Sequence, residues 1–346
     1  MNLLLIGYCH LDDGFLYASE ALKKLGYNIY FFPYFSHIMD EIDEVDYILI
    51  SKIIDNKIDI CLWWCNNITY DSYNFIINST KENNKKKIIN YFYNWDFSLY
   101  NYEKYNINHW IDNIEKKKLY YPLMDHVFTC YQKEIDYFKD SLSITYAYPG
   151  FDKDASRYEL NEDFKCDVSI VCTNLYKNKN EFPDEATNIT RKEIVDKLYE
   201  NRDKINFHIY GYENIGKEYP DCYKGFITYH NCYKVFSNST INLSIHPIVN
   251  ELFTVGDEGE YFSERVPQVL GCKSLLVTNS DLTNKLTKFK DYIYIDKNMD
   301  WFSLFLEIIN NSEKYDKIRE NGYNKALEHY QWSEWANRLD TVTKNL

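Results

Sequence analysis

The sequence predicts an α/β protein of two domains, each built around a parallel β-sheet. The chain has 346 residues, more than the ~250–300 residues that one hydrophobic core usually organises. Short apolar runs alternate with amphipathic stretches, which is the pattern of strands joined by crossover helices. A charged, turn-rich stretch over residues 149–163 interrupts this alternation and predicts the domain boundary.

The first half of the chain begins with a predicted strand, helix and strand. The apolar run 3–6 predicts the first strand, and apolar residues at helical spacing over 15–25, closed by Gly26, predict the helix. The run 29–32 predicts the second strand. We expect further buried strands where apolar runs recur, at 47–50, 60–64, 88–93, 127–130 and 144–147.

The second half repeats the pattern after the boundary. Strands are expected at 168–172, 207–210, 226–229, 241–245, 275–278 and 292–295, and helices at 191–199, 267–270, 282–289, 301–309, 313–329 and 333–346. We therefore expect an N-terminal Rossmann-like domain over 1–155, a C-terminal Rossmann-like domain over 156–330, and a C-terminal helix over 331–346 that packs back on the first domain. Ligands of such sheets bind at the carboxyl ends of the strands, which predicts a site in the cleft that the two sheets face.

Composition argues against several kinds of partner. With 39 basic and 52 acidic residues, the formal charge is -13, which repels nucleic acid and anionic lipid. The basic runs 85–87 and 116–118 are better explained as solvated faces. No apolar run is long enough to span a membrane, and residues 1–9 lack the basic leader of a secretion signal. Nine scattered cysteines indicate a reducing, cytoplasmic location.

Familiar cofactor motifs are missing from the sequence. The segment 7–14 has too few glycines for a dinucleotide fingerprint, and no P-loop occurs. Asp152 and Asp154 have the spacing of metal ligands but lie in the boundary turn, where acidic residues are favoured anyway. Cys61 and Cys65 flank an apolar segment that is better explained as a strand. We expect neither a metal nor a cofactor.

The densest polar signal lies between residues 242 and 279. It comprises a strand, a polar loop, the start of a helix with Pro267 in its first turn, and another strand. Free N–H groups at a helix start bind anions, and Arg265 beside them can form a bidentate pair with a phosphate. This segment therefore predicts a site for a phosphate-bearing ligand.

These residues resemble the donor-binding core of GT-B glycosyltransferases, in particular the CgeB-like (spore maturation protein B-like) group related to the retaining glycosyltransferase family 4. In that family two glutamates are separated by seven intervening residues; here Glu260 matches the first, whereas Gln268 replaces the second. Arg265 matches an arginine of the group, and Lys273 replaces a usual glycine. Similarity at 3–26, 94–96, 148–152, 167–171, 321–323 and 330–333 extends the resemblance over nearly the whole chain, and its motifs are weak in the first half and fairly specific in the second.

The resemblance implies a role for each of these residues. Glu260 would hold the donor sugar, and Arg265 and Arg191 would stabilise the departing diphosphate, where negative charge grows. Lys177 and Lys179 are weaker candidates for the same task. In the first domain, His10 follows the first strand at the position of a catalytic base, and Asp96 is similarly placed. The other implied donor contacts are Gly225, Phe226 and Ile227 with the nucleobase, Gln268 with the ribose, and Val266.

The resemblance thus implies a metal-independent, retaining glycosyltransferase that moves a sugar from a nucleoside-diphosphate donor to a glycan or small-molecule acceptor. An alternative is a catalytically silent nucleotide-sugar-binding protein of the same fold, because Gln268 offers the ribose a weaker hydrogen bond than a glutamate does. A second alternative is a GT-B enzyme that acts on DNA, which the charge of -13 disfavours.

Overall fold

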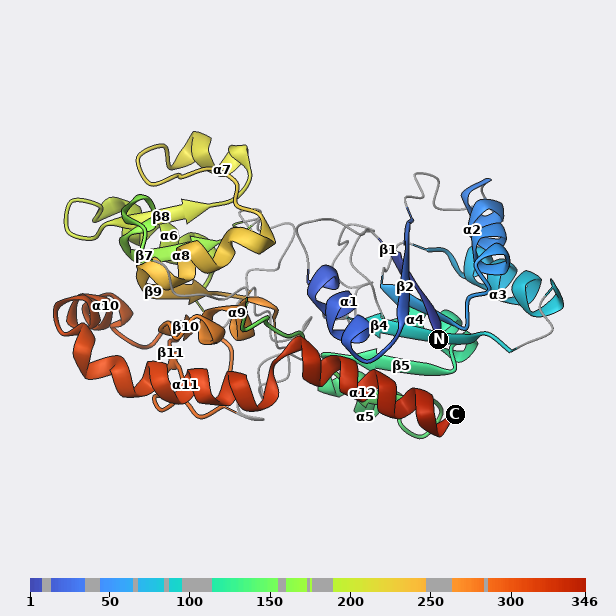
Figure 1. The fold of residues 1–346 in the computed structure, drawn as a ribbon. Helices are drawn as coiled ribbons and strands as arrows, with labels where there is room; N and C mark the ends of the chain where they lie inside the picture. Colours follow the sequence, from blue (N-terminus) through green and yellow to red (C-terminus); the bar gives the residue numbers. More distant parts are fainter. Residues whose placement is uncertain are drawn as a thin grey trace. The chain divides into compact units, whose positions relative to one another are not determined.

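The chain forms two compact units in a computed structural model. Residues 1–7, 14–34, 44–64, 68–83, 87–94, 114–154, 160–172, 175, 189–246, 263–282 and 286–346 are described. The first unit comprises the described residues up to Tyr148 together with Ser333–Leu346, and the second comprises those of Pro149–Trp332. Figure 1 shows a sheet with flanking helices in each unit.

The first unit is built on a six-stranded sheet in which every pair of neighbours is parallel. The strands follow the order β2-β1-β3-β4-β5-β6. The chain order reverses between β1 and β3, and in doubly wound sheets ligands bind at such a switch point. The strands are β1 (Asn2–Gly7), β2 (Asn28–Pro33), β3 (Ile60–Trp64), β4 (Ile89–Asn94), β5 (His126–Thr129) and β6 (Ile144–Tyr146).

Helices cover both faces of this sheet. The cluster around Trp63 includes buried side chains of α2 (Glu44–Asp55), α3 (Tyr70–Asn83), α4 (Ile114–Tyr120), η2 (Tyr121–Leu123) and α5 (Gln132–Phe138). The next residue of β3, Trp64, points to the opposite face because side chains alternate along a strand. There its ring lies 5.5 Å from that of Trp335 in α12 (Trp332–Asn345). The helix α1 (Phe15–Lys24) connects β1 to β2.

Polar contacts add to the attachment of α12 to the first unit. The Tyr27 hydroxyl donates to Asp340 at 2.9 Å, and the Tyr91 hydroxyl donates to Thr343 at 3.0 Å. The last residues of the chain are therefore part of the core of the first unit.

The second unit repeats the strand order of the first. Its five parallel strands follow the order β11-β10-β9-β7-β8, so the switch point lies between β7 and β9. The strands are β7 (Cys166–Val171), β8 (Phe207–Tyr210), β9 (Ser239–Ser244), β10 (Leu276–Thr278) and β11 (Ile293–Tyr294).

The core of the second unit joins this sheet to helices that include α6 (Arg191–Glu200) and α10 (Trp301–Asn310). The helices α8 (Cys232–Asn238) and α9 (Arg265–Gly271) contact β7, β9 and β10, and α11 (Asp316–His329) packs on α9. Shorter helices are α7 (Glu213–Glu218), η3 (Glu162–Phe164), η4 (Tyr229–Asn231) and η5 (Ser312–Tyr315).

The predicted α/β class with two parallel sheets is confirmed, and three predicted elements are wrong. Residues 47–50 lie inside α2 and form no strand. The buried residues of α2 are Asp46, Leu49, Ile50 and Ile53, which have the i, i+3, i+4, i+7 spacing of an amphipathic helix. The apolar run 47–50 is only about one helical turn long, so by itself it does not show the period of the helix.

The predicted strand 226–229 and the predicted helix 282–289 are also wrong. Gly225 has a φ of 99°, a left-handed conformation that interrupts an extended chain, and residues 226–228 form no strand. Residues 286–289, the described end of the predicted helix, carry no helix. They enter a turn in which Asp291 accepts a hydrogen bond from the Thr287 amide at 2.8 Å.

Candidate functional site

Polar side chains gather at the carboxyl ends of β7, β9 and β10 in the second unit, beside the β7/β9 switch point. Cys172 follows β7, His246 lies two residues beyond β9, and Asn279 follows β10. Parallel strands bring their carboxyl ends to one edge of the sheet, where doubly wound sheets bind ligands. This edge is the candidate functional site.

Asn279 holds two segments of the site together. Its side-chain oxygen accepts from the His246 amide at 2.8 Å, and its side-chain nitrogen donates to the oxygens of His246 and Ile189 at 2.8 and 2.9 Å. These bonds fix the chain after β9 to the segment just before α6. Sequence reasoning gave Asn279 no role, although a polar residue directly after an apolar strand is a usable signal.

Arg191 is the first residue of α6, and its position is set by a capping box. The Thr190 hydroxyl accepts from the Glu193 amide, while the Glu193 carboxylate accepts from the Thr190 amide. The Arg191 side chain is 4% exposed, and its Nε donates to the Ile245 oxygen at 2.6 Å. The guanidinium is therefore held at the carboxyl end of β9.

Arg265, the first residue of α9, brings a second positive charge to the same place. Its charge and that of Arg191 both act on the His246 imidazole and on the Cys172 thiol. Because both charges act on the same two buried residues, both guanidinium groups lie near the carboxyl ends of β7 and β9. The structure thus brings together the two arginines that the sequence predicted for a diphosphate.

His246 stays neutral in this environment. Burial first, and then the charges of Arg265 and Arg191, lower the pKa of His246 well below its usual 6.5. The uncharged imidazole therefore does not place a third positive charge beside the two arginines. Its Nε2 lies 3.1 Å from the Ser244 hydroxyl.

Stability is expected to fall on acidification because of His246. Unfolding restores the ordinary pKa of 6.5 to His246. Below that pH the unfolded chain therefore binds a proton that the folded chain does not bind. The free energy of unfolding consequently decreases as the pH falls. His246→Gln cannot take up this proton. Between pH 7 and pH 5 its melting temperature should drop less than that of the wild type; an equal drop would show that His246 does not contribute.

The first turn of α9 offers fewer free N–H groups to an anion than the sequence predicted. The Val266 amide already donates to the Ser263 oxygen at 3.0 Å, its side chain is buried, and Pro267 has no N–H. The charge of Arg265 is therefore the main attraction for an anion here. Gln268 lies three residues after Arg265, on the same face of the helix, and is half-buried.

The segment of Gly225, Phe226 and Ile227 lies near the carboxyl end of β8. The Gly211 amide, one residue beyond β8, donates to the Gly225 oxygen at 3.0 Å. Phe226 is 50% exposed and stacks on Tyr212, which is 55% exposed, with a ring distance of 5.7 Å. This exposed aromatic pair presents flat faces on which a planar group can stack. Sequence reasoning had missed Tyr212.

The corresponding edge of the first sheet carries a buried ion pair. Glu134 in α5 and Lys117 in α4 form a salt bridge with no exposure of either side chain. Asn94, the last residue of β4, donates to both oxygens of Glu134 at 3.0 Å, and Thr129 at the end of β5 donates at 2.7 Å. Tyr121 donates at 3.1 Å. This network fixes the ends of two central strands.

Three predicted site residues, His10, Asp96 and Glu260, lie outside the described residues, as do the weaker candidates Lys177 and Lys179. In the part of the chain that the structure describes, no group of three or more His, Cys, Asp or Glu side chains has a metal-binding arrangement. No helix among the described residues has the length and apolar character to cross a membrane.

Comparison with solved structures identifies the architecture. HepE from Anabaena, solved with UDP-glucose, matches over the full length of both chains with a TM-score of 0.67 and 10% identity. A glycosyltransferase from Rickettsia africae matches at 0.63 and 11%, over 99% of this chain and 98% of its own. An α-glucosyltransferase solved with UDP and DNA matches at 0.63 and 12%, over 99% of both chains. These likenesses confirm the predicted GT-B fold.

One sequence comparison falls in the half of the chain that holds the arginines. Residues 191–341 match a family model described as glycosyl transferase-like, and this segment contains Arg191, Arg265 and Gln268. A putative ankyrin repeat protein of Acanthamoeba polyphaga mimivirus is 26% identical over 249 residues, which are 68% of this chain. The chain spans about a third of the length of that relative, 32%.

Proposed function

We propose that this GT-B-fold protein transfers a sugar from a nucleoside-diphosphate donor, as a retaining enzyme of the CgeB-like group. The observation that carries the proposal is the convergence of Arg191 and Arg265 at the β7/β9 switch point. Two guanidinium groups at one edge of the sheet match the charge and the fork geometry of a diphosphate.

We assign a binding group to the diphosphate, to the nucleobase and to the sugar of the donor. Arg265 and Arg191 stabilise the charge that grows on the diphosphate as the sugar departs, so the protein's own cations do the work that a metal ion does elsewhere. The exposed pair of Tyr212 and Phe226 accepts the nucleobase. Val266 contributes apolar packing beneath the site, and Glu260 is assigned to the hydroxyls of the donor sugar.

We assign the acceptor, a glycan or a small molecule, to the first unit. His10 and Asp96, each close after a strand of that sheet, are the proposed groups that contact it. The α-glucosyltransferase of similar fold was solved with DNA, but the charge of -13 opposes binding to duplex DNA. A salt-sensitive affinity for duplex DNA would favour a DNA acceptor instead.

A nucleotide-sugar-binding protein without catalysis is the second candidate, because Gln268 stands where the related family has an acid. Titration calorimetry with UDP, GDP and their sugars, followed by an assay of donor hydrolysis, separates the two functions. Binding together with hydrolysis supports the enzyme. Binding without turnover supports the silent protein, and no binding of any nucleotide contradicts both.

Gln268→Glu should keep or improve the affinity for the donor. A carboxylate accepting a ribose hydroxyl contributes about 1.5–3 kcal/mol, compared with about 0.5–1.5 for a neutral partner. The midpoints of these ranges differ by about 1.3 kcal/mol, so we expect a gain of roughly tenfold at most sites of this kind. Titration with the nucleotide sugar that binds the wild type measures it. A large loss of affinity would place the ribose away from α9.

A further inference from the structure

One buried side chain at the carboxyl edge of the second sheet bonds to two separate segments of the chain. Asn279, which follows β10, is 1% exposed. Its side-chain oxygen accepts from the backbone N–H of His246 at 2.8 Å, and its side-chain nitrogen donates to the backbone oxygens of His246 and Ile189 at 2.8 and 2.9 Å. A backbone N–H can only donate and a backbone oxygen can only accept. These partners therefore fix which way the Asn279 amide points.

The Arg191 side chain closes these contacts into a network. Ile189 lies two residues before Arg191 in the chain. The Arg191 Nε donates at 2.6 Å to the backbone oxygen of Ile245, the residue before His246. The Asn279 network therefore joins the start of α6 to the ends of β9 and β10. Its five residues, none of which is more than 5% exposed, are Ile189, Arg191, Ile245, His246 and Asn279.

The position of Arg191 depends on Asn279 from two sides. Without the Asn279 amide, the backbone of His246 loses two hydrogen bonds and that of Ile189 loses one. Buried backbone groups that lose their partners are costly, so both segments would shift toward new partners. The Arg191 backbone follows Ile189, and its Nε is bonded to the residue before His246. The guanidinium would therefore shift with both segments.

We propose that Asn279 is a positioning residue, which holds the Arg191 guanidinium where it meets the diphosphate of the nucleotide sugar. The inference rests on the proposed function, which assigns Arg191 to that diphosphate. Arginine binds phosphate oxygens through the N–H groups of a planar fork, so its contribution depends on orientation as well as on charge. Both N–H groups of the Asn279 amide bond within the network, and Asn279 therefore acts on the donor through Arg191.

Asn279→Ala should weaken the binding of UDP-glucose by roughly tenfold or more, because a displaced guanidinium keeps its charge but loses its geometry. Titration calorimetry below the melting temperature of the variant measures this loss. Asn279→Asp keeps the shape of the side chain and the bond from the His246 amide, but a carboxylate has no N–H for the two backbone oxygens. It should lose affinity in the same way, and it serves as the test if the alanine variant does not fold.

A double-mutant cycle separates positioning from a general loss of structure. Arg191→Ala alone should weaken UDP-glucose binding by roughly tenfold or more, and Arg265 remains in this background, so that weak binding can still be measured. If Asn279 acts through Arg191, adding Asn279→Ala should lower the affinity by less than about twofold further. Two losses that multiply would mean that Asn279 contributes independently of Arg191, and the positioning role would be wrong.

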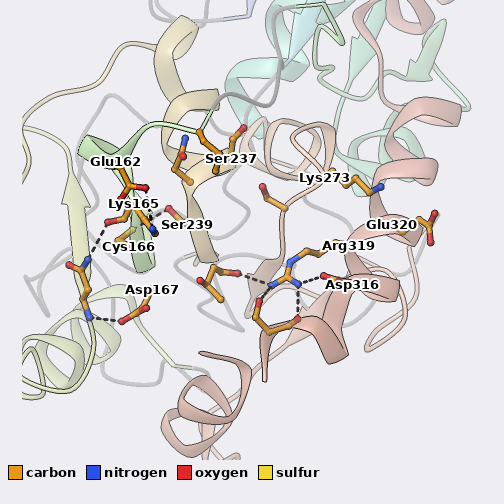
Figure 2. A pocket seen from close by; sticks show the side chains of 16 residues that line it. Glu162, Lys165, Cys166, Asp167, Ser237, Ser239, Lys273, Asp316, Arg319 and Glu320 are labelled. Atoms are coloured by element: carbon orange, nitrogen blue, oxygen red, sulfur yellow. Dashed lines mark hydrogen bonds and ion pairs between the residues drawn. The ribbon is translucent and has the colours of Figure 1, made fainter. Parts of the chain in front are cut away.

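The amino edge of the same sheet offers a control for Arg191→Ala. A cavity of about 900 Å³ lies there, at the starts of β7 and β9. Figure 2 shows Arg319 of α11 in the lining of this cavity, bonded to Asp316 at 2.8 Å. Arg319 also donates to the Ser312 oxygen at 2.8 Å. Arg319→Ala therefore removes an arginine that is likewise held by a backbone oxygen, but at the edge opposite to the proposed donor site.

Asn242→Ala is the matched control for Asn279→Ala. Asn242 is fully buried in β9, where its side chain accepts from the Ser169 hydroxyl at 2.9 Å and donates to the Phe236 oxygen at 3.1 Å. Its removal should lower the melting temperature, as the removal of Asn279 does. Both controls should keep the affinity for UDP-glucose within about twofold of the wild type.

The outcomes distinguish this inference from the proposed function. Wild-type affinity in Asn279→Ala, together with a loss in Arg191→Ala, would overturn the positioning role alone. A loss in Asn242→Ala as large as that in Asn279→Ala would overturn it too, because the effect would then follow from destabilisation of the unit. If the wild type bound no nucleotide, the proposed function and this inference would both be wrong.

Discussion

Arg265→Ala is expected to remove most of the affinity for nucleoside-diphosphate sugars and to abolish turnover. Losing one partner of a buried, hydrogen-bonded charge pair costs about 2–5 kcal/mol, which is roughly 30- to 4,000-fold in affinity. We expect a loss near the upper end of this range. Arg191 lies at the same strand ends and would be the one arginine left to bind the diphosphate. Titration calorimetry and a donor-hydrolysis assay measure the two effects.

Arg202→Ala is the matched control for this experiment. Arg202 belongs to the same unit, but it is 46% exposed and pairs with Asp221 at 3.0 Å on the surface, where ion pairs contribute about 0–1 kcal/mol. Its removal should leave donor affinity unchanged. Arg265→Lys keeps the charge but loses the planar fork and should fall between Arg265→Ala and the wild type. Unchanged affinity in Arg265→Ala would mean that the diphosphate binds elsewhere.

Glu134→Leu is expected to destabilise the first unit by about 3–5 kcal/mol, the cost of leaving a buried charge without its partner. The ammonium of Lys117 would remain fully buried, and the hydrogen bonds from Asn94, Thr129 and Tyr121 would be lost with the carboxylate. Thermal unfolding followed by tyrosine and tryptophan fluorescence measures the loss.

The double variant Lys117→Met/Glu134→Gln should recover most of that stability. Methionine removes the buried charge, and glutamine keeps an oxygen that accepts from Thr129 and Tyr121. Glu20→Ala, which breaks the exposed pair with Lys23, is the control and should change stability by about 1 kcal/mol or less. If Glu134→Leu lowers the stability no more than this control does, the buried network does not stabilise the unit.

Most of the fold was predictable because buried parallel strands leave a strong mark on the sequence. Runs such as 3–6 and 60–64 are apolar on both faces, and they became β1 and β3. The pattern failed where an apolar run was short. Residues 47–50 have the same composition as a strand, and only the position of Asp46 and Ile53 one turn away shows the helical period of α2.

The site was predictable in part. Arg191 and Arg265 were identified from a resemblance, and the structure brings them to one edge of the sheet. Their meeting, and the clamp by Asn279, depend on strand order, because β7 and β9 are neighbours although β8 lies between them in sequence. The pairing of Glu134 with Lys117 joins two helices, α5 and α4, across a strand. Charges that meet through such tertiary contacts leave no local pattern in the sequence.

Lys273 departs from the family pattern, and the structure shows the backbone conformation at this position. The sequence showed only that a lysine replaces the usual glycine. The φ of 55° shows that the turn has kept the left-handed conformation that suits glycine, so the lysine is accommodated at a cost of about 1–2 kcal/mol.

We infer that the carboxyl edge of the second sheet holds a nucleoside diphosphate between two arginines, and a crystal structure of the protein with UDP-glucose would show this site. In that structure we expect diphosphate oxygens within about 3 Å of guanidinium nitrogens of Arg265, with Arg191 on the same phosphates and the uracil near Phe226. A diphosphate bound at any other place, with the Arg265 side chain turned away from it, would mean that the donor site is assigned wrongly.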